Sequence, residues 1–419
     1  MSEGISTSPE KVKNLGWQVT FAGLGINLAL GILYTWSVIR GGIPEEWGWI
    51  EDHKALPYSV ACLVFSLIMV PAGRMQDKLS PRLVATIGGI LVGVGMIICS
   101  MSGSSVSGYV IGFGVLAGAG IGFGYASATP PAVKWFPAAK TGLIAGLVVS
   151  GFGLASAYAA PLTNALIEWK GLENTIMYLG IGFLIIVVLL AQFLKTPPEG
   201  YVPEGTPPPD PSTASNKVDY KPSEMLKTWQ FWALWFMYAC GAGAGLMVIS
   251  MAKSLGKEIE AGIFMVMALA IGNGGGRVIA GMVSDKLGRK ATLILFLLIQ
   301  AGAIILLSIS SPENLIGTLG VSLILIALVG ANYGSNLALF PSFTKDFYGL
   351  KNFGMNYGLI FTAWGVGGFM LSQLAAMIFR KTGSYTYSYY ISAGLLVCAA
   401  VLTIAMKKPE AQEMASAES

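Results

Sequence analysis

Twelve apolar runs, each long enough to cross a lipid bilayer, constrain the fold of this chain more than any other feature. A membrane-spanning helix needs about 20 predominantly apolar residues. Because hydrocarbon offers no partner for backbone N–H and C=O groups, such runs fold as helices. The runs lie near residues 15–39, 55–72, 82–102, 106–130, 141–167, 174–195, 229–251, 260–282, 290–309, 314–340, 355–379 and 385–406. The sequence therefore predicts an all-α membrane protein with twelve transmembrane helices.

The composition supports a membrane environment and excludes several functional classes. Only 11% of the 419 residues are charged, against about 25% in soluble domains. The four cysteines form no CxxC pair, and the single histidine, His53, has no second histidine or cysteine with which to form a metal site. We find no hydrolytic, redox or nucleotide-binding constellation in the sequence. We therefore expect no enzyme, no cofactor, no bound metal and no nucleic-acid partner.

The basic residues predict the orientation in the membrane. An even number of spans places both termini on one side. Only seven of the 26 lysines and arginines fall in loops of the opposite side, and one, Arg277, falls within a span. The positive-inside rule assigns the side with the larger number to the cytoplasm. We therefore expect a multi-pass protein of the cell (inner) membrane with both termini cytoplasmic.

A polar, proline-rich stretch from Thr196 to Met225 divides the spans six and six. Its prolines disfavour helix and its few apolar residues cannot form a core, which predicts an extended cytoplasmic linker. We expect an N-terminal six-helix bundle over residues 1–195, a linker over 196–228 and a C-terminal six-helix bundle over 229–419. The equal halves predict two bundles related by pseudo-symmetry.

A repeated loop motif supports this duplication. GRMQDKLSPR (Gly73–Arg82) follows the second span, and GMVSDKLGRK (Gly281–Lys290) follows the eighth. Both resemble the motif G-x-x-x-D-[RK]-x-G-[RK] of the major facilitator superfamily, although the first copy has Ser80-Pro81 where a glycine is expected. The resemblance implies the major facilitator fold. We expect the charged residues of the two loops to form a conformational latch, with solvated turns as the alternative; they are Asp77, Lys78, Asp285, Lys286 and Arg289.

Arg277 is the candidate substrate ligand. An arginine in the middle of a span costs about 2.5–3.5 kcal/mol and usually faces a bundle interior, although snorkelling toward the interface is an alternative. Asn273 lies one turn earlier on the same helix face. No aspartate or glutamate falls securely within a span. An arginine without an acidic partner predicts a substrate that brings its own carboxylate, which the planar guanidinium can bind through two hydrogen bonds.

Further residues are candidates for lining a central cavity. Leu28 and Phe152 are candidate walls for a short apolar tail, and Trp364 is a third. Tyr125, Tyr333 or Asn273 can recognise a hydroxyl group. The polar and aromatic candidates are also compatible with simple packing or with the aromatic belt at the membrane interface. The aromatic candidates lie on the first, fourth, tenth and eleventh spans: Tyr34, Tyr125, Tyr333 and Trp364.

Four stretches resemble a narrower branch of the superfamily, the oxalate–formate antiporters and their monocarboxylate-transporter relatives. The resemblance implies that the arginine of the eighth span binds a carboxylate, which matches Arg277, and that Tyr34 and Tyr125 line the cavity. The stretches are LYTWSV (Leu33–Val38), GFGYASATPPAVKWFPAAKTGLIAG (Gly122–Gly146), EMLKTWQFWALW (Glu224–Trp235) and LFPSFTKDFYGLKNFGMNYGLIFTAWG (Leu339–Gly365).

Two departures from these relatives narrow the expected substrate. Oxalate carriers have a lysine, a second cation, where this chain has Trp364. Animal monocarboxylate transporters have an acid where this chain has Asn273, and a lysine in the first span that has no match here. The resemblance implies alternating-access transport of small monocarboxylates such as lactate, with proton symport expected and anion exchange of the oxalate–formate type as the alternative. We expect a monomer in the bilayer whose partners are a small carboxylate and a proton.

Overall fold

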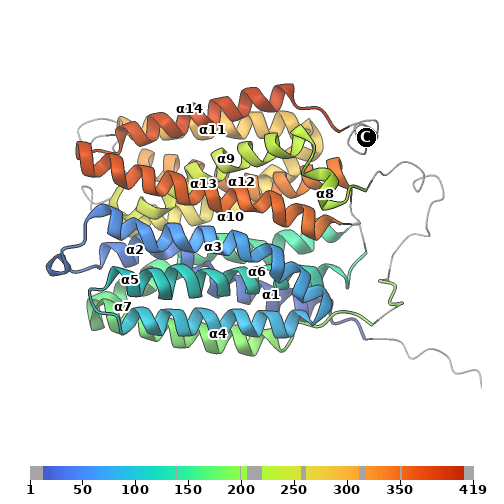
Figure 1. The fold of residues 1–419 in the computed structure, drawn as a ribbon, viewed down its shortest axis with the longest axis horizontal. Coiled ribbons are helices and arrows are strands. Elements are labelled where there is room, and N and C mark those ends of the chain that lie inside the picture. Colours follow the sequence, from blue (N-terminus) through green and yellow to red (C-terminus); the bar gives the residue numbers. More distant parts are fainter. Residues whose placement is uncertain are drawn as a thin grey trace, which may run out of the picture.

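The structure, a computed structural model, describes residues 13–137, 140–198, 200–204, 219–255, 261–310, 318–349 and 352–409. Within these ranges it describes only the backbone of four residues: Asp77, Thr141, Gly142 and Asp285. The described chain folds into helices, and none of its residues forms a strand (Figure 1). This confirms the predicted all-α fold class.

The first half of the chain is a bundle whose first and fourth crossings each contain a non-α segment. A 3₁₀ segment, η1, interrupts the first crossing and a π-helical segment, η3, interrupts the fourth. A short 3₁₀ turn, η2 (Glu45–Trp47), lies in the loop after the first crossing. The membrane elements are α1 (Gly16–Leu30), η1 (Gly31–Thr35), α2 (Trp36–Gly41), α3 (Glu51–Lys78), α4 (Pro81–Ser100), α5 (Val106–Tyr109), η3 (Val110–Ala117), α6 (Gly118–Val133) and α7 (Thr141–Ala191).

The helix α7 contains two crossings. A straight α-helix of its 51 residues would be roughly 75 Å long, more than twice the hydrocarbon thickness of about 30 Å. At Gly171 φ is 78° and ψ is 171°, a conformation that glycine adopts readily. Val148 and Leu190, on either side of this point, lie against neighbouring parts of α1 at Gly23 and Gly25. The chain therefore reverses at Gly171, between the predicted spans 141–167 and 174–195.

The second half begins with a short helix and continues with six crossings. Eleven helical segments of the described chain are long and apolar enough to cross a membrane, and α7 counts twice. The described residues thus make the twelve predicted crossings. The elements are α8 (Pro222–Met225), α9 (Trp229–Leu255), α10 (Gly262–Leu287), α11 (Arg289–Ser308), α12 (Leu319–Tyr348), α13 (Phe353–Thr382) and α14 (Thr386–Ala405).

Several helices extend beyond the apolar runs that predicted them. The helix α3 spans Glu51–Lys78 around the predicted 55–72, and α12 continues through Pro341 to Tyr348. The apolar pattern marks the hydrocarbon layer, whereas helical hydrogen bonding continues into the interface. The first residues of the predicted spans 260–282 and 314–340, and part of the predicted linker, lie outside the described residues.

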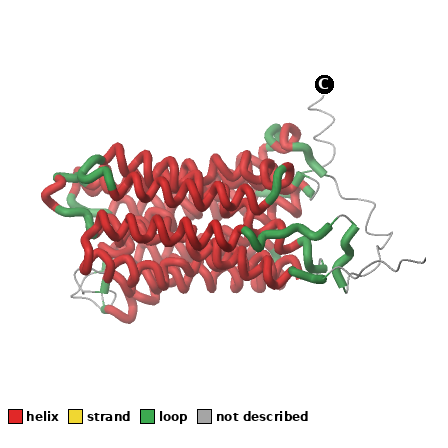
Figure 2. The backbone as a smooth tube through the Cα atoms, turned by 90° about the horizontal axis from the view of Figure 1, so that it is seen from below, coloured by secondary structure: helices red, strands yellow, loops and turns green. Residues whose placement is uncertain are grey.

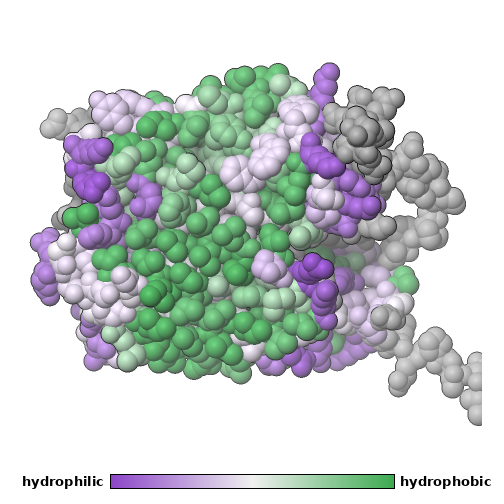
Figure 3. Space-filling model, in the orientation of Figure 1, coloured by the Kyte–Doolittle hydropathy of each residue, from purple (hydrophilic) through white to green (hydrophobic). Residues whose placement is uncertain are grey.

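The helices run side by side and the loops gather at the two ends of the bundle (Figures 1 and 2). The described chain ends, Lys13 and Pro409, lie at one end, which we call the proximal end. The opposite end, which we call the distal end, contains the turns at Gly42, Gly171 and Gly383. A broad apolar surface separates the two polar ends (Figure 3). This distribution is that of a multi-pass membrane protein.

The two halves meet where α3 packs on α13, α7 on α10, and α2 on α9. Glycines permit the closest of these approaches. A Cβ atom on Gly365 of α13 would lie 1.9 Å from Ser66 Oγ of α3. A Cβ atom on Gly153 of α7 would lie 3.3 Å from Arg277 Nε of α10. The halves therefore touch closely in the region of Arg277.

Within the second half, α10 and α12 pack backbone against backbone. Each helix carries two glycines four residues apart, Gly272 and Gly276 on α10, and Gly330 and Gly334 on α12. Such spacing lets membrane helices approach closely. A Cβ atom on Gly276 would lie 2.0 Å from the carbonyl oxygen of Ala331. This contact fixes the position of α10 relative to α12.

Replacing Gly276 with alanine tests this contact. The added methyl group cannot fit against the Ala331 carbonyl, so we expect Gly276→Ala to lower the stability by about 1–3 kcal/mol. The matched control is Gly275→Ala, because no atom lies within 4 Å of a Cβ atom at that position. Thermal melting of the purified proteins in detergent compares the two. Equal melting temperatures for both variants would contradict the close packing.

Candidate functional site

Arg277 lies between the two halves of the bundle and is only 5% exposed. Its Nη1 donates to the carbonyl oxygen of Val149 on α7 at 2.7 Å, and its Nε donates to Asn273 Oδ1 at 3.3 Å. The Val149 contact crosses from the second half to the first. The side chain thus points into the protein interior, which favours the interior position over snorkelling.

Two donors at this position have no acceptor. Arg277 Nη2 and Asn273 Nδ2 are buried and have no hydrogen-bond partner among the described residues. None of the ion pairs of the described side chains includes Arg277. A buried cation without a counterion is costly. The arrangement therefore suits a small anion that accepts from both groups.

Tyrosine hydroxyls surround the guanidinium. Arg277 lies within electrostatic range of four of them. These hydroxyls come from η1, α6, α12 and α13, so both halves contribute. The four residues are Tyr34, Tyr125, Tyr333 and Tyr357. Together they give a bound molecule several neutral hydrogen-bonding groups beside the single cation.

A hydrogen-bonded chain of aromatic side chains crosses between the halves at the same depth. Trp364 Nε1 of α13 donates to the Tyr333 hydroxyl of α12 at 2.8 Å. That hydroxyl shares a 2.5 Å hydrogen bond with the Tyr34 hydroxyl of η1. All three side chains are buried. These hydrogen bonds hold the indole and both phenol rings at one side of the site.

Phenylalanine rings complete the wall. Phe152 of α7 packs edge-on against Tyr34 and Tyr125, with ring centroids 4.9 and 5.3 Å apart. Phe65 of α3 contacts Tyr125 at 5.4 Å and Trp364 at 5.0 Å. The structure therefore places the predicted residues Tyr34, Tyr125, Tyr333, Trp364 and Phe152 in one aromatic cluster near Arg277.

Leu28 lies apart from these ring contacts. It is half-buried on α1, and its carbonyl oxygen accepts from the Tyr158 hydroxyl of α7 at 2.9 Å. One residue earlier, Asn27 Nδ2 donates to the carbonyl oxygen of Val148 at 3.1 Å. The backbone of α7 at residues 148 and 149 thus accepts from both α1 and α10. The role of Leu28 as a pocket wall stays a prediction.

Three aromatic residues of the site were not among the predicted ones. Tyr357 and Phe361 precede Trp364 by seven and three residues on α13, a spacing that places them on one helix face. This periodicity in NYGLIFTAW is a signal that could have identified them. Phe65 carries no comparable signal, because only the packing of α3 against α13 brings it to the site.

The predicted latch residues lie at the proximal end. Lys78 and Lys286 are exposed. Arg289 donates to the Ser284 hydroxyl, and its Nε lies 3.5 Å from Asp346 Oδ2 of the same half. The latch function of this set stays a prediction. The side chains of two members lie outside the described part of the structure: Asp77 and Asp285.

Comparison with known protein families shows the family to which the chain belongs. The family model described as Major Facilitator Superfamily matches residues 29–370 and 243–419. The chain belongs to this superfamily. It is therefore a membrane transporter and not an enzyme. The superfamily predicted from the repeated loop motif is confirmed.

Relatives within the superfamily support the narrower resemblance. The chain is 27% identical to the uncharacterized MFS-type transporter YhjX of Escherichia coli (strain K12), over 86% of this chain and 87% of that protein. It is 26% identical to the oxalate:formate antiporter of Oxalobacter formigenes, over 88% and 86%. It is 22% identical to human monocarboxylate transporter 11, over 94% and 83%. The predicted branch of the superfamily is confirmed.

Solved structures share the fold. A bacterial homologue of the human lysosomal transporter Spinster, in an inward-facing and occupied conformation, superposes with a TM-score of 0.65. The match covers 96% of this chain and 99% of that one at 15% sequence identity. At this identity the likeness establishes the major facilitator fold alone. It agrees with the two six-helix bundles predicted from the sequence.

Proposed function

We propose that this member of the superfamily is a secondary active transporter of small monocarboxylates such as lactate, and that it works by alternating access. The observation that carries the proposal is the buried Arg277, whose Nη2 has no partner among the described residues. A carboxylate can accept from Nη2 and from Asn273 Nδ2 and can neutralise the guanidinium. If the anion also accepts from Nη1, the hydrogen bond between Nη1 and the Val149 carbonyl breaks. This loses a contact between the halves and so links substrate binding to their relative movement.

The surroundings of Arg277 favour a monoanion with a short apolar tail. One guanidinium pairs one carboxylate, and a second carboxylate would be left unpaired in an aromatic site. Trp364 occupies the place where oxalate carriers have a lysine. The Phe152, Phe65 and Trp364 rings offer apolar contacts, with Leu28 as a further candidate wall. Tyr125, Tyr333 or Asn273 can recognise a hydroxyl group on the substrate.

Proton symport is the preferred mode of coupling in this proposal. One anion and one proton form a neutral load that can cross beside Arg277 without moving net charge. Because no acidic side chain among the described residues pairs with Arg277, the proton travels on the substrate or on nearby water. The alternative is anion exchange, which the 26% identity to an oxalate:formate antiporter supports.

We further propose a monomer of the inner membrane with a cytoplasmic proximal end, two bundles bounded at residues 195 and 229, and a proximal latch. The excess of lysine and arginine at the proximal end supports the orientation. An impermeant thiol reagent added to intact cells should therefore label a cysteine at Glu46, exposed at the distal end, and spare one at Lys408. The opposite labelling pattern would reverse the orientation.

The role of Arg277 is tested by substitution. Arg277→Gln removes the cation, so we expect saturable uptake of labelled lactate into proteoliposomes to fall by roughly 30-fold or more. Arg277→Lys should restore little, since an ammonium cannot reproduce the planar fork. Lys407→Gln, at an exposed proximal position outside the two loop motifs, is the matched control and should transport normally. Wild-type affinity in the Arg277→Gln protein would refute the assignment.

Competition experiments test the substrate class and the coupling. Unlabelled lactate and similar monocarboxylates should inhibit uptake, whereas oxalate and malonate should not, because their second carboxylate has no partner. Trp364→Lys should weaken this preference if the side chain faces the substrate, with Trp364→Phe as the control for lost packing. An inward proton gradient should drive lactate accumulation. Uptake that ignores the gradient but requires an anion on the other side would support exchange.

A further inference from the structure

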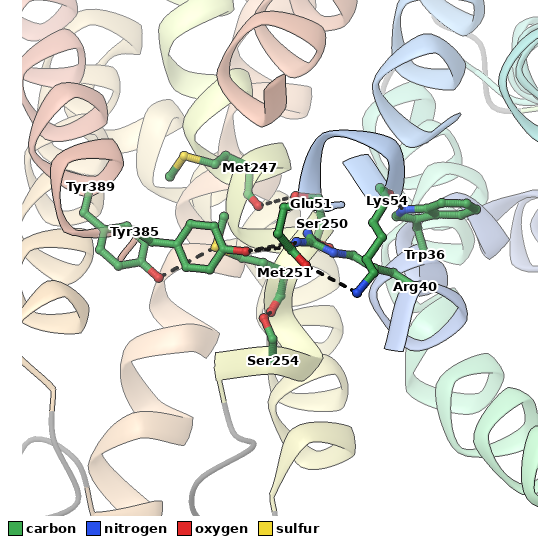
Figure 4. A network of polar contacts seen from close by, with 10 residues as sticks. All are labelled: Trp36, Arg40, Glu51, Lys54, Met247, Ser250, Met251, Ser254, Tyr385 and Tyr389. Atoms are coloured by element: carbon green, nitrogen blue, oxygen red, sulfur yellow. Dashed lines mark hydrogen bonds and ion pairs between the residues drawn. The ribbon is translucent and has the colours of Figure 1, made fainter. Parts of the chain in front are cut away.

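Polar side chains close the distal end of the bundle around one ion pair. Arg40 at the end of α2 pairs with Glu51 at the start of α3, and both belong to the first half (Figure 4). Arg40 Nη2 also donates to the Tyr385 hydroxyl of the second half at 2.9 Å. That hydroxyl donates to Glu51 Oε2 at 3.2 Å, and Arg40 Nη1 donates to the Ser250 carbonyl oxygen at 3.4 Å. The ion pair of one half thus holds two groups of the other.

A second ion pair joins the two halves at the distal end. Arg380 Nη1 of the second half lies 2.9 Å from Asp52 Oδ2 of the first. At the proximal end, the ion pairs of the described side chains stay within the second half or the linker. These are Arg289–Asp346 and Lys221–Glu224. Arg380–Asp52 thus joins the two halves directly at the distal end.

The Arg40–Glu51 pair is more buried than the Arg380–Asp52 pair and has further contacts within its own half. Arg40 is 9% exposed, whereas Arg380 is 48% exposed. Lys54 Nζ lies 3.4 Å from Glu51 Oε1, and the Lys54 carbonyl oxygen accepts from Trp36 Nε1 of α2 at 2.9 Å. Splitting a buried ion pair leaves an uncompensated charge. Arg40 and Glu51 must therefore move together when the distal end opens.

Unlike the Arg40–Glu51 ion pair, Tyr385 contributes an uncharged group to the distal contacts. It lies between α13 and α14, and its ring stacks on Phe379 of its own half with centroids 4.5 Å apart. Burial raises the pKa of the Tyr385 phenol, so the hydroxyl keeps its proton at neutral pH and can donate to Glu51. Its release leaves no charge without a partner, because Arg40 and Glu51 still neutralise each other.

We propose that the Arg40–Glu51 pair is the fixed part of a distal gate and that the Tyr385 hydroxyl is the part released when the gate opens. This inference rests on the alternating access proposed above. The short helix α2 carries Arg40 and follows directly on η1, which carries Tyr34 of the substrate site. A 3₁₀ segment within a helix often marks a hinge. Movement of Tyr34 is therefore transmitted to the gate over a single helical segment.

Spin labels on opposite sides of the gate test the proposal. They are placed at Glu46→Cys and Lys381→Cys, both exposed distal positions, in a full-length protein whose native cysteines are replaced by alanine. Distances are measured by pulsed electron spin resonance without substrate. Tyr385→Phe removes the hydroxyl but keeps the ring, so we expect the ratio of distal-open to distal-closed molecules to rise about tenfold.

Two further variants make the outcome decisive. Tyr390→Phe, an exposed position on α14, is the matched control and should give the parent distance distribution. Asp52→Asn breaks the more exposed bridge and should open the distal end less than Tyr385→Phe does, because exposed ion pairs contribute little. A parent-like distribution for Tyr385→Phe, or a larger shift for Asp52→Asn, would overturn the gate.

The spin-label distances test the gate independently of the proposed substrate. Suppose that Tyr385→Phe opens the distal end but the parent protein, with Tyr385 in place, does not transport lactate. This result would support the gate and reject only the substrate assignment. Distances that stay short in every variant, with and without 10 mM lactate as an order-of-magnitude saturating dose, would overturn the gate and argue against alternating access as well.

Discussion

A guanidinium held inside the hydrocarbon layer needs acceptors that only the protein or a bound molecule can provide. Arg277 finds two, the carbonyl of Val149 and the side chain of Asn273. The Val149 contact requires α7 and α10 to approach closely, and Gly153 and Gly274 permit this. The hydrogen bond of Arg277 thus depends on the packing of α7 against α10. It also leaves Nη2 free for an anion.

The aromatic cluster belongs to both halves at once. Phe65, Phe152 and Tyr34 come from the first half, whereas Tyr333 and Trp364 come from the second. A relative movement of the halves must therefore separate some of these rings. The hydrogen bond between Tyr34 and Tyr333 is the most direct link between them. The distances between the rings of the site therefore change whenever the two halves move relative to each other.

The contacts that close the distal end are individually modest. A typical hydrogen bond contributes about 1 kcal/mol, and an exposed ion pair such as Arg380–Asp52 contributes less. A carrier needs conformations that differ by only a few kcal/mol, so that binding can shift the balance between them. Strong apolar packing within each half, such as the glycine contact of α10 with α12, keeps the bundles intact while these weaker contacts exchange. Rigid halves joined by weak polar contacts suit this purpose.

The sequence by itself determined the twelve crossings and the all-α fold, because the bilayer imposes a length on apolar runs. The high cost of a buried charge also singled out Arg277, whose role as a substrate ligand stays a prediction. It also predicted Tyr34, Tyr333 and Trp364 as cavity residues, and the structure brings these three side chains into contact. Only the tertiary structure decided that Phe65 completes the aromatic wall and that Tyr385 reaches the Arg40–Glu51 pair. The contacts of Phe65 with Trp364 and of Arg40 with Tyr385 join residues more than 290 positions apart. No local sequence pattern predicts contacts between helices so distant in the chain. The membrane acts on each segment separately, whereas the site depends on how the segments pack together.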